Sequence, residues 1–486
     1  MLFNSWQYLI FYPITVLAYF ILPKKLKNLW LLGASYYFYM GWNPKYVVLL
    51  FFTTIVTYGG SLVLERYRSR WVLFAVIAVN FGILFYFKYA RFAFSNLEWL
   101  CQVAGIPFES PDFDILLPVG ISFFTFQAIG YTIDVYRKEI YAEKNFFRYA
   151  LFVSFFPQLV AGPIERSKSL LKQLDKTYSF SYNRMREGML LIIWGFFLKL
   201  VIADRAAIFV DAIFADSNKY DGLYIVTACV FFAFQIYCDF SGYSIIAMGS
   251  ARILGLELMD NFNAPYFSKS IREFWQRWHI SLSSWFKDYL YIPLGGSRKG
   301  TMKTSANLMI VFLVSGLWHG AAWTYLVWGG LNGLFQVAGK ATRNIRGCIR
   351  KALCIQEEGF SHRLLRGAVT FIMVDFTWFF FRIKGLRNSV RVLKTIITGF
   401  NPWIFTDESL FQCGLDRKNF YLLILSIAVL MAADYGKYKG ICIREKILKQ
   451  DFWFRWLVFA GGALFVVIFG IWGGSYDAKS FIYFQF

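Results

Sequence analysis

The chain has 486 residues, of which 57% are hydrophobic and 17% charged, and it carries a formal net charge of +21. Soluble domains are about half apolar and about a quarter charged, so this composition excludes an ordinary soluble protein. The positive charge does not indicate a nucleic-acid partner, because the basic residues are divided among short connections between apolar runs.

Apolar runs follow one another along the chain, many of them near the roughly 20 residues that cross a hydrocarbon core. They occupy residues 5–22, 28–40, 46–64, 71–94, 115–135, 146–163, 188–210, 222–250, 306–318, 321–339, 368–381, 390–405, 418–434 and 452–474. A membrane barrel is excluded, because its strands would alternate apolar and polar residues whereas these runs are apolar all round. We expect an all-α polytopic protein with roughly ten to twelve crossings, the other runs being re-entrant or tilted.

The connections between the runs alternate in charge. Lysine and arginine collect at residues 24–27, 66–70, 298–303, 343–351 and 437–449, and acidic residues at 98–114, 211–221 and 407–416. The positive-inside rule places basic connections in the cytosol. We therefore expect a multi-pass protein of the cytoplasmic membrane, with residues 251–305 and 340–367 inside and the N-terminus and the C-terminal tail outside.

Seven cysteines and three histidines are too scattered to suggest a cross-linked or metal-binding protein. No C-x-x-C pair occurs, so we predict neither a disulfide framework nor a zinc site. Polar residues inside apolar runs concentrate between about residues 115 and 340, and Asp239 is one of them. A carboxylate at membrane depth needs a partner, so we expect a hydroxyl or an arginine beside Asp239.

Residues 271–289 have the pattern of an amphipathic helix with a period near 3.6 residues. The positions that fall on one polar face are Arg272, Gln276, His279, Ser283 and Lys287. Such a helix either lies at the cytosolic interface with snorkelling basic residues or lines a wet cavity. In the second case this face would bind an anionic substrate entering from the cytosol.

A basic, glycine-rich loop follows at Leu294–Gly300. It lacks the G-x-x-x-x-G-K-[ST] pattern, because Thr301 takes the lysine position, so an ATP site is not indicated. Arg298 and Lys299 either form an ordinary cytosolic turn or meet a phosphorylated carrier.

His319 stands in the apolar sequence Ser-Gly-Leu-Trp-His-Gly-Ala-Ala-Trp at 315–323. One interpretation is a buried histidine that is hydrogen-bonded to a helix carbonyl. The other is functional, because an ionisable group at membrane depth is costly and marks pathways and catalytic sites. Histidine also titrates near neutral pH and can move protons.

Small and aromatic residues flank this histidine. Gly316 and Gly320 would let another backbone or a substrate approach closely. Trp318 and Trp323 would wall a narrow cavity. The segment therefore predicts a confined site in which His319 transfers protons.

Several motifs recur in the same order as in a known family. They are Pro118–Gln127, Ala161–Arg166, Asp239–Tyr243, Glu273–His279 and Leu317–Gly320. The chain resembles the membrane-bound O-acyltransferases (MBOAT), in the bacterial branch that includes alginate and peptidoglycan O-acetyltransferases, over essentially its whole length. The resemblance implies an MBOAT fold, with transmembrane, re-entrant and amphipathic helices around a central tunnel. It implies a single domain, 1–486, with N-terminal helices 1–114, a catalytic core 115–340 and C-terminal helices and tail 341–486.

The resemblance also implies an activity. The enzyme would pass an acyl group, most simply acetyl from acetyl-CoA, from a cytosolic thioester to hydroxyls of an exported polysaccharide or cell-wall polymer. His319 takes the place of the catalytic histidine and His279 that of a second motif histidine, with Arg272, Lys287, Arg298 and Lys299 as candidate donor-binding residues. No cofactor or metal is expected to be bound. The expected partner, besides the lipid bilayer, is a secreted or membrane-anchored SGNH-type acyltransferase or esterase.

Two positions depart from the family pattern. Asn332 stands where many relatives have another histidine, which implies that this third histidine is dispensable. Ile245 stands where alginate-type relatives often have aspartate, which argues against alginate itself as the substrate. Two alternatives remain: a D-alanyl transferase of the teichoic-acid type fed by a carrier protein, and a transporter or flippase, which would also have interrupted helices.

The tail Ser480–Phe486 is rich in aromatic side chains, each worth about 1.5–3 kcal/mol when buried. It either docks on the bundle as a hydrophobic clasp or enters the outer mouth of the tunnel and presents Tyr483 toward His319. In the second case Tyr483 would accept the acyl group covalently and pass it to the external partner.

Overall fold

Every regular element in the computed structural model is a helix, within the residues that it describes, which are 1–111, 117–356 and 359–472. The all-α class expected from the sequence is confirmed. Six helical segments among these residues are long and apolar enough to cross a membrane: Pro44–Tyr67, Arg70–Val103, Gly222–Leu254, Phe360–Arg382, Arg417–Tyr438 and Phe452–Phe469. The chain is therefore a multi-pass membrane protein.

Some of the expected crossings are divided into shorter helices. The apolar run 146–163 forms α7 (Phe146–Ser154) and α8 (Phe156–Leu159), because Phe155 between them is not helical, with φ −52° and ψ 112°, and a proline stands in the first turn of α8. All of these residues are buried except at the start of α7. Broken helices at membrane depth are tolerated where protein surrounds them.

The run 188–210 is divided in a different way. α10 (Tyr182–Phe196) passes into a π-helical segment, η4 (Phe197–Ala203), before α11 (Asp204–Ala215) begins. Every residue of η4 is buried. π-Helical turns are rare and frequently lie at functional sites, and this one carries the buried Lys199 described below.

The chain divides into two compact units. Unit 1 comprises Met1–Leu191 and Ile246–Met259, and unit 2 comprises Ile192–Ile245 and the described residues from Asp260 onward. Helices α10 and α12 (Gly222–Leu254) contribute residues to both. The single domain over 1–486 stays a prediction.

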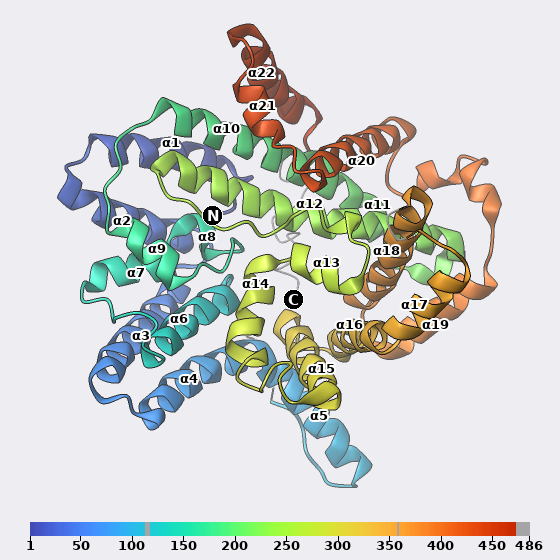
Figure 1. The fold of residues 1–486 in the computed structure, drawn as a ribbon, viewed down its shortest axis with the longest axis horizontal. Coiled ribbons are helices and arrows are strands. Elements are labelled where there is room, and N and C mark those ends of the chain that lie inside the picture. Colours follow the sequence, from blue (N-terminus) through green and yellow to red (C-terminus); the bar gives the residue numbers. More distant parts are fainter. Residues whose placement is uncertain (112–116, 357–358, 473–486) are drawn as a thin grey trace. The chain divides into compact units, whose positions relative to one another are not determined.

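Unit 1 is built around α6 (Ile121–Tyr136), whose residues are almost all buried. It packs against α3 and α4, and α7 packs against α2 and α3 (Figure 1). Buried hydroxyl groups form hydrogen bonds with each other where these helices cross. Tyr149 Oη, for example, donates to Thr57 Oγ1 at 2.7 Å. The other helices of this unit are α1 (Trp6–Ile21), α2 (Lys27–Met40), α3 (Val47–Tyr67), α4 (Arg70–Leu84), α5 (Ala90–Val103) and α9 (Ser167–Leu174).

Unit 2 holds both motif histidines. α15 (Gly300–His319) packs along α16 (Trp323–Ala341), α16 packs on α18 (Phe360–Arg382), and α13 (Ile271–Arg277) contacts both α16 and α18 (Figure 1). The site described below lies among these elements. The other helices of this unit are α14 (Ile280–Phe286), α17 (Arg343–Ala352), α19 (Leu386–Thr398), α20 (Arg417–Tyr438), α21 (Ile443–Leu448) and α22 (Phe452–Phe469).

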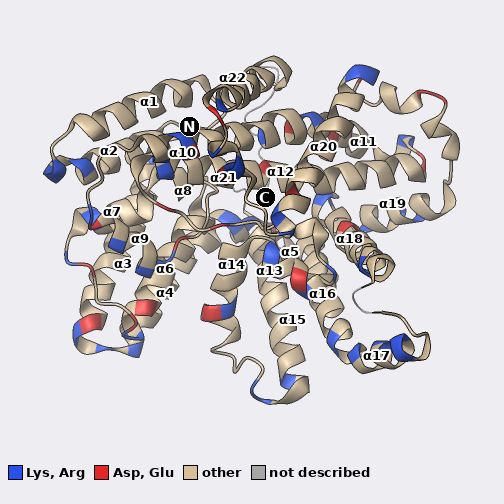
Figure 2. Cartoon of the chain, turned by 45° about the horizontal axis from the view of Figure 1, so that its top comes forward, with Lys and Arg blue, Asp and Glu red and all other residues tan. Residues whose placement is uncertain are grey.

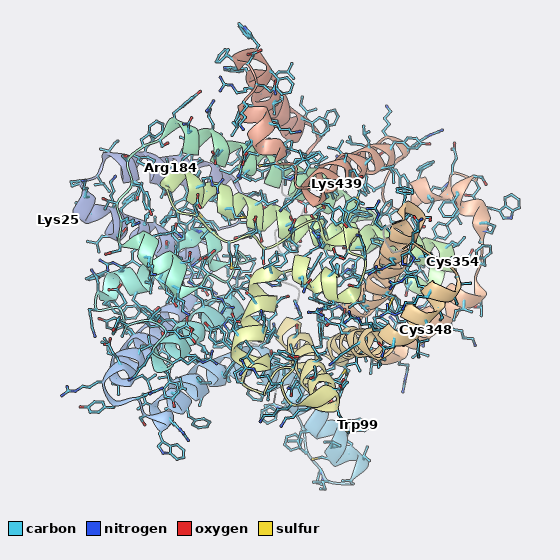
Figure 3. The ribbon with its side chains drawn as sticks, viewed as in Figure 1. Lys25, Trp99, Arg184, Cys348, Cys354 and Lys439 are labelled. Carbon is cyan, nitrogen blue, oxygen red and sulfur yellow. The ribbon has the colours of Figure 1, made fainter. Side chains whose placement is uncertain are left out.

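The connection between α16 and α18 is strongly basic. Figure 2 shows lysine and arginine along α17, which has no acidic residue. Its apolar residues Ile345 and Ile349 are exposed too, the pattern of a helix that lies in a membrane interface. Cys348 and Cys354, labelled in Figure 3, are exposed on this connection, and all seven cysteines are free thiols.

Candidate active site

His319 is the last residue of α15 and is 4% exposed. The helix ends there because Gly320 and Ala322 are extended, with φ of −168° and −151°, so the chain turns before α16 begins. α15 and α16 then lie side by side (Figure 1). The turn leaves the imidazole buried where the two helices join.

Glycines bring α15 and α16 into close contact. A Cβ at Gly316 would overlap the carbonyl oxygen of Tyr325, and a Cβ at Gly329 would overlap that of Phe312. Each of these glycines is followed by another four residues on, the G-x-x-x-G spacing of tightly packed membrane helices. The close approach expected at Gly316 is therefore made by a neighbouring backbone.

Aromatic rings enclose His319 on several sides. The ring centroids of Trp318, Trp328 and Phe381 lie 4.8, 4.9 and 5.4 Å from that of the imidazole. Trp318 was expected as a wall and is one. Trp323 was expected as the other wall, but it is 53% exposed. Trp328, from the buried face of α16, takes that place.

The segment 271–289 is not the continuous helix that its periodicity predicts. α13 ends at Arg277, Trp278 is extended, and His279 is left-handed at φ +45° and ψ +54° before α14 starts. His279 is completely buried, whereas Arg272 and Lys287 are exposed. The predicted common polar face was wrong, because the break turns His279 away from that face.

A neighbouring loop holds this break. The Asn261 carbonyl accepts the Ile280 N–H at 2.9 Å, and Asn261 Oδ1 accepts the Ser281 N–H at 3.3 Å. Asn261 Oδ1 also lies 3.1 Å from His279 Nδ1. A left-handed non-glycine residue costs of order 1–3 kcal/mol and persists only where its surroundings hold it, often at functional sites.

The break and the α15–α16 turn bring the two histidines together. Their ring centroids are 6.4 Å apart, although the residues are 40 positions apart in the sequence. The ring centroids of Phe240 and Trp318 lie 4.6 and 5.9 Å from the ring centroid of His279. The arrangement provides two imidazoles in an apolar, aromatic enclosure, a chemistry suited to moving a proton under exclusion of water.

The predicted donor-binding residues lie at the surface. Arg298 and Lys299 are exposed on the loop before α15, where Gly295 and Gly300 are left-handed at φ +106° and +82°. Asn307 Nδ2 fastens this loop by donating to the Gly296 carbonyl at 3.0 Å. The four basic residues do not contact either histidine and do not form one cluster with them, so their donor role stays a prediction.

Asp239 on α12 forms a buried ion pair. Lys199 Nζ on η4 lies 2.6 Å from Asp239 Oδ1 and 2.8 Å from Asp204 Oδ1. The ion pair is with a lysine, where a hydroxyl or an arginine was expected. Gly242 makes room for it, since a Cβ there would lie 3.1 Å from the Lys199 backbone nitrogen.

Sequence reasoning did not single out Asn261 or Trp328. Trp328 is one tryptophan in an apolar helix, and Asn261 had only one signal, a second asparagine two residues later between two helices. Asn332, on the buried face of α16, accepts the Trp275 indole N–H at 3.1 Å and donates to the Trp328 carbonyl. Among the described residues no group of three His, Cys, Asp or Glu side chains could hold a metal ion. Tyr483 lies outside the described residues.

Comparison with known proteins gives the family. Residues 137–382 match the family model of MBOAT, the membrane-bound O-acyltransferase family. The probable alginate O-acetylase AlgI of Pseudomonas putida is 37% identical over 444 residues, covering 90% of this chain and 88% of that protein. The peptidoglycan O-acetyltransferase of Helicobacter pylori is 34% identical over 438 residues, covering 82% of this chain and 80% of that protein.

A more distant relative matches a smaller part. The teichoic acid D-alanyltransferase of Streptococcus thermophilus is 29% identical over 250 residues, covering 48% of this chain and 59% of that protein. The match to the O-acetylases therefore extends well beyond the region shared with the D-alanyl enzyme. Taken with the helical architecture and the buried pair of motif histidines, these matches show that the chain is an enzyme of the membrane-bound O-acyltransferase family.

Proposed function

We propose that this enzyme transfers acetyl from a cytosolic thioester, acetyl-CoA, to hydroxyls of an exported polysaccharide or cell-wall polymer. The observation that carries the proposal is the buried pair His279–His319, with ring centroids 6.4 Å apart, in a chain of this family. The alginate and peptidoglycan relatives match 90% and 82% of the chain. The D-alanyl relative matches 48%, which favours acetyl as the acyl group.

The proposed reaction needs one proton transfer and one exchange of bonds. His319 removes the proton from the attacking hydroxyl, whose oxygen forms a bond to the thioester carbonyl carbon. The carbon–sulfur bond breaks, and the thiol leaves with a proton returned by the imidazole. His279 supports this step from the adjacent ring. The products are an ester and free coenzyme A. Atoms and electrons balance in this reaction without an external oxidant, reductant or metal.

The test is acetyl transfer by the purified protein in lipid vesicles. Acetyl-CoA labelled in the acetyl group is supplied on one side, and acylated polymer or thiol release is measured, with D-alanyl carrier protein as the alternative donor. Acetyl-dependent transfer supports the proposal. Transfer from the D-alanyl carrier alone contradicts the acetyl assignment, and activity with neither donor contradicts the donor class.

We place the donor on the side of the basic connections, with residues 251–305 and 340–367 in the cytosol and both chain ends outside. The charge distribution supports this orientation. A central tunnel would then join the donor to a hydroxyl supplied from outside, where an SGNH-type partner would complete the transfer to polymer.

Neutralising the exposed basic residues is expected to weaken donor binding. Arg272→Gln with Lys287→Gln, or Arg298→Gln with Lys299→Gln, should raise the apparent KM for acetyl-CoA by about 1.4- to fivefold per residue, since exposed ionic contacts are worth about 0.2–1 kcal/mol. kcat should stay nearly unchanged. Lys384→Gln, an exposed residue after α18, is the matched control. If both pairs leave KM at the wild-type value, these residues are only interfacial.

Tyr483 is proposed as a covalent relay on the evidence of the tail sequence. Its phenol, with a reference pKa of about 10, is easier to deprotonate than a sugar hydroxyl. Tyr483→Phe should abolish polymer acetylation at normal protein levels, while Tyr476→Phe, a second tail tyrosine, should not. Full acetylation by the Tyr483→Phe protein would leave the tail as a hydrophobic clasp.

A further inference from the structure

In the loop that precedes α13, the side chain of Asn261 contacts His279 and is 1% exposed. We propose that Asn261 is a positioning residue that holds His279 as its Nδ1–H tautomer, so that His279 Nε2 is a hydrogen-bond acceptor that orients His319 through one bridging water. The catalytic part of this inference rests on the function proposed above. The tautomer does not depend on it.

The orientation of the Asn261 amide follows from a backbone group. The Ser281 N–H can only donate, and it faces Asn261 Oδ1 at 3.3 Å, so that atom is the carbonyl oxygen. Ser281 Oγ donates to the same oxygen at 2.9 Å, and Asn261 Nδ2 donates to Ser244 Oγ at 3.2 Å. Every contact agrees with one assignment of oxygen and nitrogen.

The tautomer of His279 follows in turn. Nδ1 lies 3.1 Å from the Asn261 oxygen, so Nδ1 must carry a proton to make this bond. In a neutral imidazole the other nitrogen, Nε2, then holds a lone pair. Hydrogen bonding to one ring nitrogen is the usual way in which proteins set the role of the other.

Burial keeps this imidazole neutral. His279 is fully buried, lies outside the six apolar spans and has a pKa lowered by desolvation to about 3. It therefore remains neutral across the physiological pH range. A ring with such a pKa serves better as a hydrogen-bond acceptor than as a carrier of a net proton.

The spacing of the two rings suggests how His279 acts on His319. A centroid separation of 6.4 Å is too wide for a direct hydrogen bond between ring nitrogens, even if they face each other, and it leaves room for one oxygen. A water there can donate to His279 Nε2 and accept an N–H of His319. The other nitrogen of His319 is then the base, and the imidazolium that forms is stabilised.

Nitrogen NMR of the protein labelled with ¹⁵N-histidine in lipid tests the tautomer directly. Three histidines give few signals, and His279→Gln assigns the one that matters. We expect His279 to be protonated at Nδ1 and unprotonated at Nε2 between about pH 5 and 8. A ring protonated at Nε2 alone, or charged at pH 7, overturns the proposal whether or not the protein transfers acetyl.

Steady-state kinetics test the positioning role. Asn261→Ala should lower kcat by about 10- to 100-fold with little change in KM, an effect of the size seen when a group that orients a metal-bound histidine is removed. Asn261→Asp should recover part of that loss, since a carboxylate also accepts the Nδ1–H. The carboxylate charge raises the pKa of His279, and a protonated Nε2 cannot accept a hydrogen bond. As the pH is lowered, activity of the Asn261→Asp protein should therefore begin to fall at a higher pH than activity of the wild type.

A purely structural role predicts a different pattern. It would make Asn261→Ala and Asn261→Asp equally defective, with the wild-type pH profile, and that result would overturn the positioning role. Asn263→Ala removes a neighbouring amide of the same loop and should keep wild-type kinetics. If the wild type transfers no acyl group while the NMR result holds, the proposed function fails and the tautomer stands.

Discussion

Replacing His319 with alanine or glutamine is expected to lower the rate of acetyl transfer by about 10²–10⁴-fold, the usual contribution of a positioned general base. The imidazole is 4% exposed, and the rings of Trp318, Trp328 and Phe381 that enclose it have no group that could act as a base in its place. Glutamine keeps most of the side-chain volume and a hydrogen-bonding end, which limits repacking of the aromatic rings. The measurement is transfer from acetyl-CoA by purified protein in lipid.

The third histidine is the matched control. His362, in the first turn of α18, is half-buried and does not belong to the histidine pair. His362→Ala should retain transfer close to that of the wild type. Size-exclusion profiles establish that each variant is folded. Near-wild-type transfer by a folded His319→Gln protein would remove His319 from the role of base.

Adding a single methyl group at either of two adjacent glycines of α16 is expected to have opposite effects on the stability of the protein. Gly329→Ala forces a Cβ into the backbone carbonyl of Phe312, and a backbone atom cannot give way as a flexible side chain can. Overpacking of this kind typically costs about 1–3 kcal/mol, and here it also displaces the helix end that carries His319. We expect a lower melting temperature and a large loss of transfer.

Gly330→Ala provides the comparison. A Cβ there would meet only Leu313 Cδ2, at 3.7 Å, which is an ordinary contact. Alanine is favoured over glycine within a helix by up to about 1 kcal/mol, so this variant should be as stable as the wild type or more so. Thermal unfolding of both proteins in detergent measures the difference. Equal melting temperatures for the two variants would show that the α15–α16 contact is not tight.

Much of the fold follows from composition because the bilayer imposes it. An unpaired backbone polar group is costly in hydrocarbon, so long apolar runs without period-two alternation have to be helices. The six spanning segments correspond to runs at 46–64, 71–94, 222–250, 368–381, 418–434 and 452–474. The break in the run 146–163 also has a local cause, because a proline stands in the first turn of α8. The motif containing His319 could be recognised for a similar reason, since a histidine in an apolar run is conspicuous.

The conformation of the chain at His279 was decided by tertiary contacts and could not be predicted from the local sequence pattern. The apolar period through 271–289 is that of one helix, yet the chain breaks at His279. The break is held because the N–H groups of Ile280 and Ser281 donate to Asn261, which fixes a left-handed backbone that no local preference selects. That break buries His279 and sets it beside His319.

The walls of the site and its buried charges were decided in the same way. Trp323 and Trp328 are equivalent in an apolar sequence, and only the packing of α16 on α15 buries the second and leaves the first exposed. Lys199 pairs with Asp239 because η4 approaches α12 at Gly242, a contact between segments 40 residues apart. The sequence by itself therefore determined the membrane class, the six long apolar helices and the importance of His319, since these depend on local polarity. Only the folded chain decided which side chains face each other, because that depends on long-range contacts.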